Sequence, residues 1–330
     1  MSVGIAEDAR VGFPEGARVV VTGAAGFIGS HLCRALAARG VARIVALDHL
    51  GFGSWNDLGP LEDGKTVRVT RDLAEMDREA FAPVLEGADV LFHLAAEKHN
   101  NSLDDPQRVL AVNVAASQRL FEAAERAGVA KTVFTSSLYA YGRSRLPAMR
   151  ESELPKPRTI YGISKLAGEH LLRACGDGGL DTATVRLFFV YGPGQYAGKG
   201  YRSVIVSNFD RILCGQPPLV RGDGEQALDY VYVDDAIDAL LRAAAGRGRP
   251  GPYNVGSGKV VTVNALTRTM LRVAKSDLEP VHVEADWTAG SCRLGDCSRI
   301  AADLGWKPRV GLEQGLAHTW EWMKRGGHRA

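Results

Sequence analysis

A tyrosine and a lysine four residues apart suggest acid–base chemistry on a hydroxyl group. Tyr161 and Lys165 lie in the segment YGISK, and residues four apart share one face of a helix. An ammonium group close to a phenol favours the phenolate, so this tyrosine could act as a base near neutral pH. Ser137 follows the apolar run Lys131–Ser136 and could hydrogen-bond the same substrate oxygen. We therefore take Ser137, Tyr161 and Lys165 as candidate catalytic residues.

A glycine-rich turn near the start of the chain is typical of a dinucleotide site. The run TGAAGFIG supplies Gly23, Gly26, Phe27, Ile28 and Gly29. Glycine permits the tight turn and the close approach of a pyrophosphate to the backbone, and the helix that follows offers free N–H donors to phosphates. A tight turn without any ligand is the alternative for such a pattern taken alone.

An acidic residue at the end of the second strand favours NAD over NADP. Asp48 stands 19 residues after Gly29, where a carboxylate can accept hydrogen bonds from the ribose hydroxyls and repels a 2′-phosphate. Further cofactor contacts are expected at the ends of the next two strands, from Asp72 and Leu73 and from Leu94, Ala95 and Ala96. His93 is interpreted as a packed strand-end histidine rather than a catalytic one.

Apolar runs that alternate with helical segments predict the fold that positions these residues. The predicted strands are Arg18–Thr22, Arg43–Asp48, Thr66–Thr70, Asp89–Leu94, Lys131–Ser136 and Thr182–Leu187. Runs that are apolar on both faces are what a parallel sheet covered by helices requires, and the predicted helices include Phe27–Arg39 and Pro106–Ala127. The fold class is therefore α/β, with a Rossmann-type doubly wound parallel sheet.

After residue 187 the alternation loosens into glycine-rich loops and a helix near Arg202–Cys214, which predicts a smaller, interleaved α/β substrate lobe. We expect residues 17–187 and about 228–258 to form the NAD-binding domain, and about 188–227 and 259–325 the substrate lobe. The ends, 1–16 and 326–330, are expected to be mobile.

Composition excludes several classes of protein. The 330 residues contain 40 basic and 38 acidic side chains, too balanced for a dedicated nucleic-acid binder. No apolar run is long enough for a membrane span. The five cysteines include no CxxC pair, which argues against a disulfide framework and a zinc site. We expect a cytoplasmic protein that needs no metal.

At this point the chain resembles the extended short-chain dehydrogenase/reductase superfamily, and within it the NAD-dependent sugar epimerase/dehydratase family typified by UDP-glucose 4-epimerase. The resemblance runs from about Ala17 to Lys324. Besides the segments above, it rests on Asn113, Arg186, Tyr191–Gly194, Gly222–Gly224, Asp229–Asp235, Tyr253–Gly258 and Leu304–Pro308.

The resemblance implies a Rossmann lobe with bound NAD, a small sugar-nucleotide lobe and a homodimer formed by two helices of each subunit. By motif position it assigns the catalytic roles to Ser137, Tyr161 and Lys165. It also places Lys98 and Asn113 beside the cofactor.

Two departures from the family pattern restrict the range of substrates and reactions that we expect. Family members that eliminate water carry an Asp–Glu pair where this chain has Leu138 and Tyr139, so a 4,6-dehydratase is not expected. Two diphosphate contacts of the family, an asparagine and an arginine, are Phe189 and Leu228 here. Loss of the arginine removes a charge-assisted contact.

Three arginines are candidates to restore positive charge at the substrate, and each could equally be a solvated surface residue: Arg202, Arg221 and Arg293. We expect a sugar nucleotide held in an unusual way, or a sugar phosphate or glycoside without a diphosphate.

The intact Ser–Tyr–Lys set without an added acid–base pair favours an epimerase. The expected reaction is inversion at C4 of a (nucleotide-)sugar through a transient keto intermediate, with the hydride returned to the opposite face. A ketosugar reductase or sugar dehydrogenase with net redox is the alternative. A non-catalytic NAD-binding protein is a third possibility, against which the retained catalytic residues count.

Overall fold

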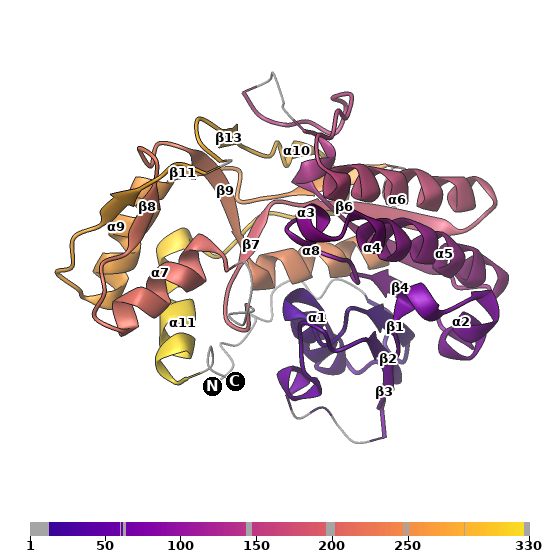
Figure 1. Ribbon diagram of the computed structural model, residues 1–330. Helices are drawn as coiled ribbons and strands as arrows, with labels where there is room; N and C mark the ends of the chain where they lie inside the picture. The colour runs from indigo at the N-terminus through magenta and orange to yellow at the C-terminus, as the bar shows by residue number, and fades with distance from the viewer. Residues whose placement is uncertain are drawn as a thin grey trace.

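A seven-stranded parallel sheet forms the centre of the larger lobe. The computed structural model describes residues 13–59, 61, 64–142, 147–195, 202–246, 248, 251–286 and 288–326. The strands follow the order β10-β6-β5-β4-β1-β2-β3 (Figure 1), the doubly wound order with one strand added. They are β1 (Arg18–Thr22), β2 (Arg43–Asp48), β3 (Thr66–Thr70), β4 (Val90–His93), β5 (Lys131–Ser137), β6 (Asp181–Leu187) and β10 (Pro252–Val255).

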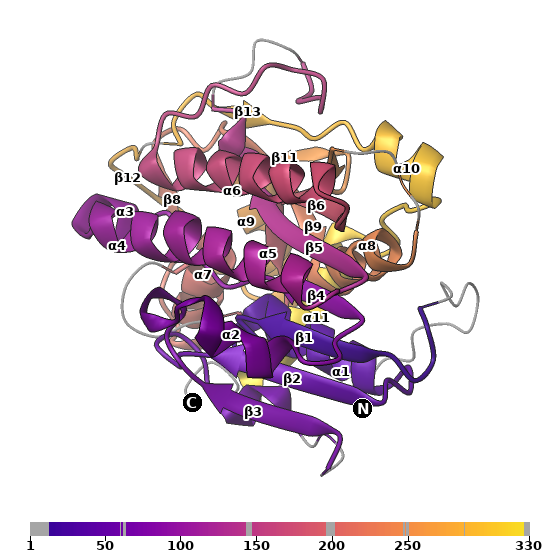
Figure 2. The ribbon, with the colours of Figure 1, turned by 90° about the vertical axis from the view of Figure 1, so that its right-hand side faces the viewer.

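Helices cover both faces of this sheet. Helices α2, α5 and α6 pack along one face, as Figure 2 shows, and α1 and α8 pack on the other. The segment predicted as one helix over Pro106–Ala127 is divided by a π-helical stretch. The helices are α1 (Phe27–Ala37), α2 (Arg78–Leu85), α3 (Asn101–Asp104), α4 (Pro106–Leu110), the π-helix η3 (Ala111–Ala116), α5 (Ser117–Arg126), α6 (Ile160–Asp177) and α8 (Val233–Ala245), with short 3₁₀ helices η1 (Trp55–Leu58), η2 (Leu73–Glu75) and η4 (Leu138–Ala140).

The second lobe lies beside the carboxyl ends of the large sheet and contains two small sheets (Figure 1). In one of them, β9 pairs with β7, β11 and β13; in the other, β8 pairs with β12. The elements are β7 (Phe189–Tyr191), α7 (Val204–Leu213), β8 (Leu219–Arg221), β9 (Ala227–Tyr232), β11 (Val260–Thr262), α9 (Val263–Ala274), β12 (Val281–Val283), β13 (Cys292–Arg293) and α11 (Leu312–Lys324). Helix α10 (Ser298–Leu304) follows β13 and packs against β10 of the large sheet.

Alternating side chains of the strands build a core on each face of the large sheet. Val19 and Val21 of β1 belong to the core that extends into the second lobe, whereas Val20 belongs to the core under α2 and α5. Because successive side chains of a strand point to opposite faces, strands covered on both sides must be apolar throughout. This is the pattern from which the sequence predicted them.

The buried carboxylate of Asp235 ties the C-terminal segment to the large lobe. It accepts hydrogen bonds from the backbone N–H groups of Arg309 and Val310, both at 3.0 Å. The backbone carbonyl of the same residue accepts a hydrogen bond from Trp306 Nε1. These contacts fix the start of α11 against α8.

Two expectations can be compared with the structure, one about the ends of the chain and one about the bounds of the large domain. Most of the ends that we expect to be mobile lie outside the described residues. Of the described residues in these ends, Phe13 is buried and stacks near Phe92. The expected large domain included about 228–258; in the structure β9 joins the second lobe's sheet, while α8 and β10 join the large one.

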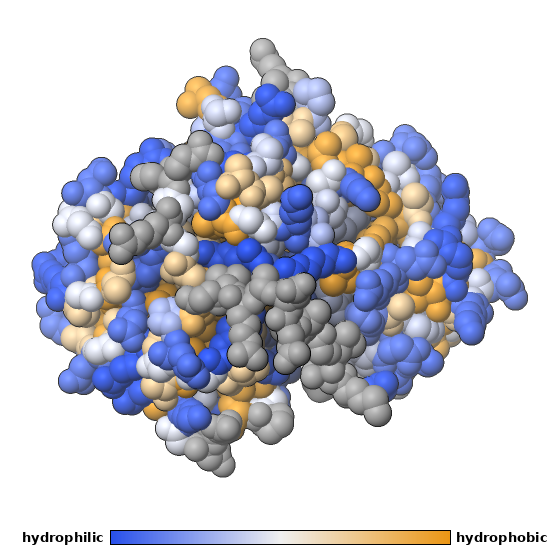
Figure 3. Space-filling model, turned by 180° about the vertical axis from the view of Figure 1, so that it is seen from behind, coloured by the Kyte–Doolittle hydropathy of each residue, from blue (hydrophilic) through white to orange (hydrophobic). Residues whose placement is uncertain are grey.

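The surface seen from behind mixes hydrophilic and hydrophobic residues, and no single hydrophobic area spans that face (Figure 3). None of the helices in the described ranges is long and apolar enough to cross a membrane.

Candidate active site

The glycine turn after β1 forms a cradle that has no room for side chains. A Cβ atom on Gly29 would lie 2.0 Å from the carbonyl oxygen of Gly23, and one on Gly23 would lie 2.8 Å from the backbone nitrogen of Ala95. Gly23 also has a φ of +70°, in the left-handed region that favours glycine. The turn and the start of α1 therefore present bare backbone, as a pyrophosphate requires.

Asp48 and Asp72 lie at the ends of adjacent strands, beside this turn. Asp48 accepts hydrogen bonds from the backbone nitrogens of Ala25 (3.0 Å) and Leu50 (2.8 Å). Asp72 accepts one from Ala74 N and forms an ion pair of 2.6 Å with Arg108. Both predicted carboxylates thus stand at the carboxyl edge of the sheet, where doubly wound folds bind ligands.

The segment after β4 is held by an asparagine of the π-helix. Asn113 accepts a hydrogen bond from Glu97 N (2.8 Å) and donates one to Glu97 O (3.0 Å). It also donates to Ser164 Oγ, so the same side chain joins this segment to α6. This contact fixes the path of the chain between Leu94 and Lys98. The Lys98 ammonium lies 4.5 Å from the centre of the Phe52 ring, and its burial lowers its pKa.

His93 has the structural role that we expected. Its two ring nitrogens lie 2.7 Å from Thr22 Oγ1 and 2.8 Å from Ser117 Oγ. Burial lowers the pKa of His93 to about 3, so the ring is neutral. It therefore packs and orients backbone at the end of β4 rather than transferring protons.

Ser137, Tyr161 and Lys165 come together at the carboxyl end of β5. The Ser137 side chain acts on the Tyr161 hydroxyl and opposes the rise of its pKa. Lys165 Nζ lies 5.9 Å from the centre of the Tyr161 ring and donates a hydrogen bond of 2.9 Å to the carbonyl oxygen of Thr135. The geometry thus joins the three residues that the sequence singled out.

The pKa values of the two acid–base groups are set mainly by burial. Burial raises the pKa of Tyr161 to about 12, against the opposing effect of the Ser137 hydrogen bond. Burial lowers the pKa of Lys165 to about 7, against the opposing charge of Glu169. The lysine was expected to lower the tyrosine's pKa; instead burial raises that pKa, and the side chain that opposes the rise is Ser137.

Two aromatic rings contact the Tyr161 ring, and an arginine lies against one of them. The ring of Tyr139 stands 5.6 Å from it and that of His99 6.2 Å, centre to centre. The guanidinium of Arg293 lies 5.3 Å from the Tyr139 ring and shares a hydrogen bond with that side chain. Of the three predicted arginines, Arg293 is therefore the one placed at the catalytic residues.

The other predicted substrate residues lie on the second lobe or at its edge. Phe189 packs against Tyr230, with the ring centres 5.9 Å apart. Arg202 pairs with Asp210 on α7, and Arg221 lies 3.8 Å from Asp286. Neither ion pair includes a residue of the Ser137–Tyr161–Lys165 set.

Leu228, which stands where the family has an arginine, is buried in the core, and its strand neighbour on β13 is Arg293. The positive charge missing at 228 is thus present on the adjacent strand, directed at the catalytic end of the site.

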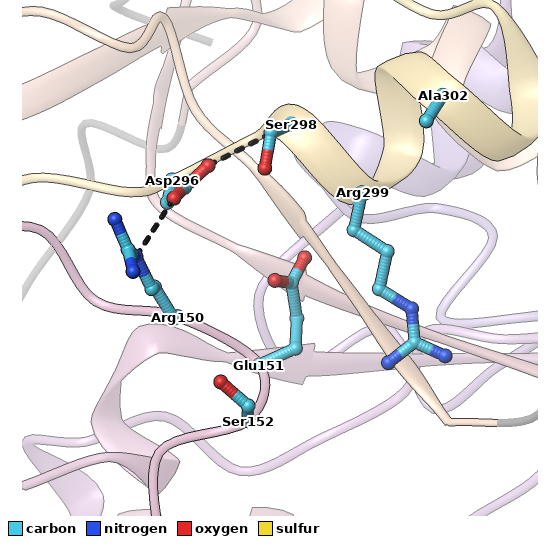
Figure 4. Close-up of a pocket in the computed structure, with 7 residues that line it drawn as sticks. All are labelled: Arg150, Glu151, Ser152, Asp296, Ser298, Arg299 and Ala302. Carbon is cyan, nitrogen blue, oxygen red and sulfur yellow. Dashed lines mark hydrogen bonds and ion pairs between the residues drawn. The ribbon is translucent and has the colours of Figure 1, made fainter.

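A separate cleft of about 710 Å³ contains none of the predicted catalytic or cofactor residues. It lies between the segment 150–152 and α10 (Figure 4). An ion pair of 3.1 Å joins Arg150 and Asp296 across its edge, and Glu151 accepts a hydrogen bond from Asn254 N. Its lining residues are Arg150, Glu151, Ser152, Asp296, Ser298, Arg299 and Ala302. Within the described residues, no group of three or more His, Cys, Asp or Glu side chains is arranged to hold a metal ion.

Two residues near the catalytic set were missed from the sequence, His99 and Glu169. Glu169 follows Lys165 by one helical turn, a spacing that could have identified it. His99 lies in an irregular segment, where no periodicity relates it to Tyr161.

A comparison with known protein families identifies the family to which this chain belongs. Residues 19–256 match the sequence model of the NAD dependent epimerase/dehydratase family. The chain belongs to this family. In this family member the glycine cradle, the two strand-end carboxylates and the candidate catalytic set all lie at the carboxyl edge of the large sheet.

The relatives of this protein match almost the whole length of its chain. The UDP-glucose 4-epimerase of Mycolicibacterium smegmatis is 35% identical over 320 residues, which are 93% of this chain and 98% of that protein. Among solved structures, the UDP-N-acetylglucosamine 4-epimerase of Methanobrevibacter ruminantium, in complex with UDP-N-acetylmuramic acid, has a TM-score of 0.89 and 31% identity, over 95% of this chain and 100% of that one.

A UDP-glucuronic acid 4-epimerase from Bacillus cereus, crystallised with UDP-glucuronic acid and NAD, has a TM-score of 0.83 and 26% identity, over 93% of this chain and 99% of that one. The protein is accordingly an NAD-dependent sugar epimerase of the extended short-chain dehydrogenase/reductase type.

Proposed function

We propose that the protein inverts C4 of a sugar nucleotide through a transient keto intermediate. The observation that carries this proposal is the Ser137–Tyr161–Lys165 set without an acid–base pair beside it, since Leu138 is buried and Tyr139 takes the other position. Bound NAD would supply the acceptor for the hydride of the carbinol carbon.

The chain's own residues perform the proton transfer and hold the sugar. Tyr161, as the phenolate, takes the proton of the C4 hydroxyl and gives it back after the sugar has turned, while Lys165 stabilises the phenolate. Ser137 hydrogen-bonds the reacting oxygen. We propose that the cofactor is held by the glycine turn together with Asp48, Asp72, Leu73, Leu94–Ala96, Lys98 and Asn113.

The experiment that tests the function uses the substrates of the relatives as a panel. UDP-glucose, UDP-N-acetylglucosamine and UDP-glucuronic acid are incubated with the enzyme in deuterated and in ordinary water, without added cofactor. The expected result is the C4 epimer of one of them without solvent deuterium at C4. Stoichiometric release of NADH would instead establish the net oxidoreductase.

Arg293 is proposed to contact the sugar end of the substrate, because it lies against Tyr139 beside the catalytic tyrosine. Arg293→Met removes a charged hydrogen-bond donor worth about 1.5–3 kcal/mol, so KM should rise about 10- to 100-fold. Binding of UDP alone, measured by calorimetry, should be unchanged.

Arg272→Met is the matched control, because Arg272 forms a surface pair with Glu313 at 3.0 Å; its KM should equal that of the wild type. If Arg293→Met weakened UDP as much as the sugar nucleotide, Arg293 would have to be assigned to the diphosphate.

We further propose a homodimer that acts in the cytoplasm. Leu103 of α3, Leu110 of α4 and Ile163 of α6 are exposed large hydrophobic residues on neighbouring helices, which lie side by side in Figure 2. Such exposed apolar clusters are typical of interaction surfaces. All five cysteines are free thiols, as fits a reducing compartment.

Introducing charge on this surface should separate the subunits. The double variant Leu103→Arg/Leu110→Arg is expected to elute as a monomer in size-exclusion chromatography with light scattering, where the wild type elutes as a dimer. Leu154→Arg, an equally exposed leucine in a loop, should leave the dimer intact. A monomeric wild type would refute the dimer.

A further inference from the structure

A group of aromatic side chains beside the catalytic tyrosine carries an arginine. The ring centres of Tyr139 and Tyr161 are 5.6 Å apart, and that of His99 lies 4.6 Å from the first and 6.2 Å from the second. We call these three residues the aromatic corner. The guanidinium of Arg293 lies over the Tyr139 ring, 5.3 Å from its centre. Tyr139 thus contacts both the arginine and the catalytic tyrosine.

Arg293 gives the aromatic corner a positive charge. Burial lowers the pKa of His99, and the charge of Arg293 lowers it further, so the imidazole is neutral. Burial also lowers the pKa of Arg293, against the opposing effect of Tyr139. A guanidinium nevertheless stays protonated in proteins. A ligand that reaches this corner therefore meets a cation.

The backbone around Arg293 is held by two parts of the molecule. Strand β13 pairs with β9, where Arg293 stands opposite Leu228. The next residue, Leu294, accepts a hydrogen bond of 2.8 Å from Met149 N, in the segment that precedes α6. Because the strand is tied on these contacts and the guanidinium stacks on a ring, the donor groups are ordered before a ligand binds. Preorganised donors lose less conformational freedom on binding.

Three carboxylates on the elements around the catalytic set pair with arginines of the large lobe. Arg108 binds Asp72 at 2.6 Å and Glu97 at 3.0 Å. Arg186 binds Glu169 at 2.7 Å. The charge of these carboxylates is thus engaged inside the large lobe, and a substrate can supply the negative group that complements the aromatic corner.

The place of the arginine indicates which part of a sugar it can contact. In a hexose whose C4 hydroxyl meets Tyr161, the diphosphate on C1 lies across the ring, and the carbons next to C4 are C3 and C5. The exocyclic carbon of a hexose, C6, is attached to C5. When C6 is a carboxylate, its planar geometry fits the fixed fork of N–H donors of a guanidinium. A buried carboxylate also requires a cation beside it, because an unpaired buried charge is costly.

We propose that the sugar of the substrate is a uronic acid, with a carboxylate at C6, and that Arg293 binds this carboxylate. Arg293 then selects acidic sugar nucleotides over neutral ones of the same size. The inference deepens the proposed function and rests on it, because it places C4 at Tyr161. The guanidinium also offsets the repulsion between the carboxylate and the phenolate that forms at Tyr161 during the reaction.

The test compares two ligands that differ only at C6, UDP-glucuronic acid and UDP-glucose. Their affinities are measured by calorimetry with NAD-loaded Tyr161→Phe enzyme, whose turnover is too slow to disturb the measurement. UDP-glucuronic acid should bind about 10- to 100-fold more tightly, as a charge-assisted pair allows. In Tyr161→Phe/Arg293→Met this preference should vanish or reverse, because the carboxylate loses its cation. Binding of UDP alone should stay as it is in Tyr161→Phe.

Two further variants in the same background separate charge from geometry and from unspecific effects. Arg293→Lys keeps the charge but not the planar fork, so its preference should lie between those of the arginine and the methionine. Arg272→Met is the matched control, because Arg272 pairs with Glu313 on the surface; it should keep the full preference. The rise in melting temperature on addition of NAD confirms that each variant is folded.

Equal affinities of the two ligands for Tyr161→Phe would overturn the proposal, as would an equal loss of both on Arg293→Met. Failure of the proposed function gives a different result. A preference for UDP-glucuronic acid that depends on Arg293, without formation of any C4 epimer by the wild type, would keep the carboxylate site and refute the epimerase. Conversely, epimerisation of UDP-glucose without that preference would leave the function intact and remove the carboxylate site.

Discussion

Tyr161→Phe is expected to lower kcat by about 10²- to 10⁴-fold, the contribution of a well-placed general base. The variant removes only the hydroxyl on which Ser137 acts, and the ring keeps its contacts with Tyr139 and His99. Binding of NAD and of the sugar nucleotide should therefore change little, and the loss should appear in kcat rather than in KM. Single-turnover measurement of hydride transfer checks this directly.

Tyr139→Phe is the matched control, because Tyr139 lies 5.6 Å from Tyr161 but has no lysine one turn later. Its kcat should stay within about tenfold of the wild type, since one neutral hydrogen bond contributes only about 1 kcal/mol. Equal losses in the two variants would mean that the base has been misassigned.

Gly29→Ala should abolish NAD binding and destabilise the fold. The added methyl group would lie 2.0 Å from the Gly23 carbonyl oxygen and 2.8 Å from Ala24 Cα. Both are backbone atoms, so the turn itself must move. Overpacking of this kind costs about 1–3 kcal/mol. The variant should also lose the rise in melting temperature that added NAD produces in the wild type, because a ligand that no longer binds the native state no longer stabilises it.

The control for this experiment is Gly311→Ala, at a glycine with an ordinary φ of −68° and open space around it. It should keep both the melting temperature and the response to NAD. If Gly29→Ala bound NAD as the wild type does, the turn after β1 would not be the pyrophosphate site.

The local features of the fold could be predicted because they depend on neighbours in the chain. The bounds of β1, β2 and β3 agree with the predicted runs, and β5 extends its run by one residue. Strands β1 and β5 are buried along almost their whole length and therefore leave continuous apolar runs. The glycine turn, Asp48 and the tyrosine–lysine pair likewise act over one turn or one strand end.

The structure differs from the sequence-based prediction where contacts between residues far apart in the chain determine the conformation. The π-helical stretch at Ala111–Ala116 places Asn113 against the segment after β4. The sequence shows no periodicity from which this stretch could be predicted. Phe13 is fixed by Phe92 although it precedes the first strand. Strand β9 joins the second lobe because β7, β11 and β13 supply its hydrogen-bond partners, and strand pairing of this kind is not encoded within the strand itself.

The sequence by itself determined the family, the parallel α/β architecture, the glycine turn and the candidate catalytic set, because each is specified by short-range spacing and by steric limits that only certain residue types satisfy. Only the tertiary structure decided that Arg293 lies against Tyr139, whose ring contacts the catalytic tyrosine, and that Glu169 pairs with Arg186. Arg293 and Tyr139 are brought together by the packing of β13 beside β9 and by the turn after β5, and such proximity depends on the whole fold rather than on any local pattern.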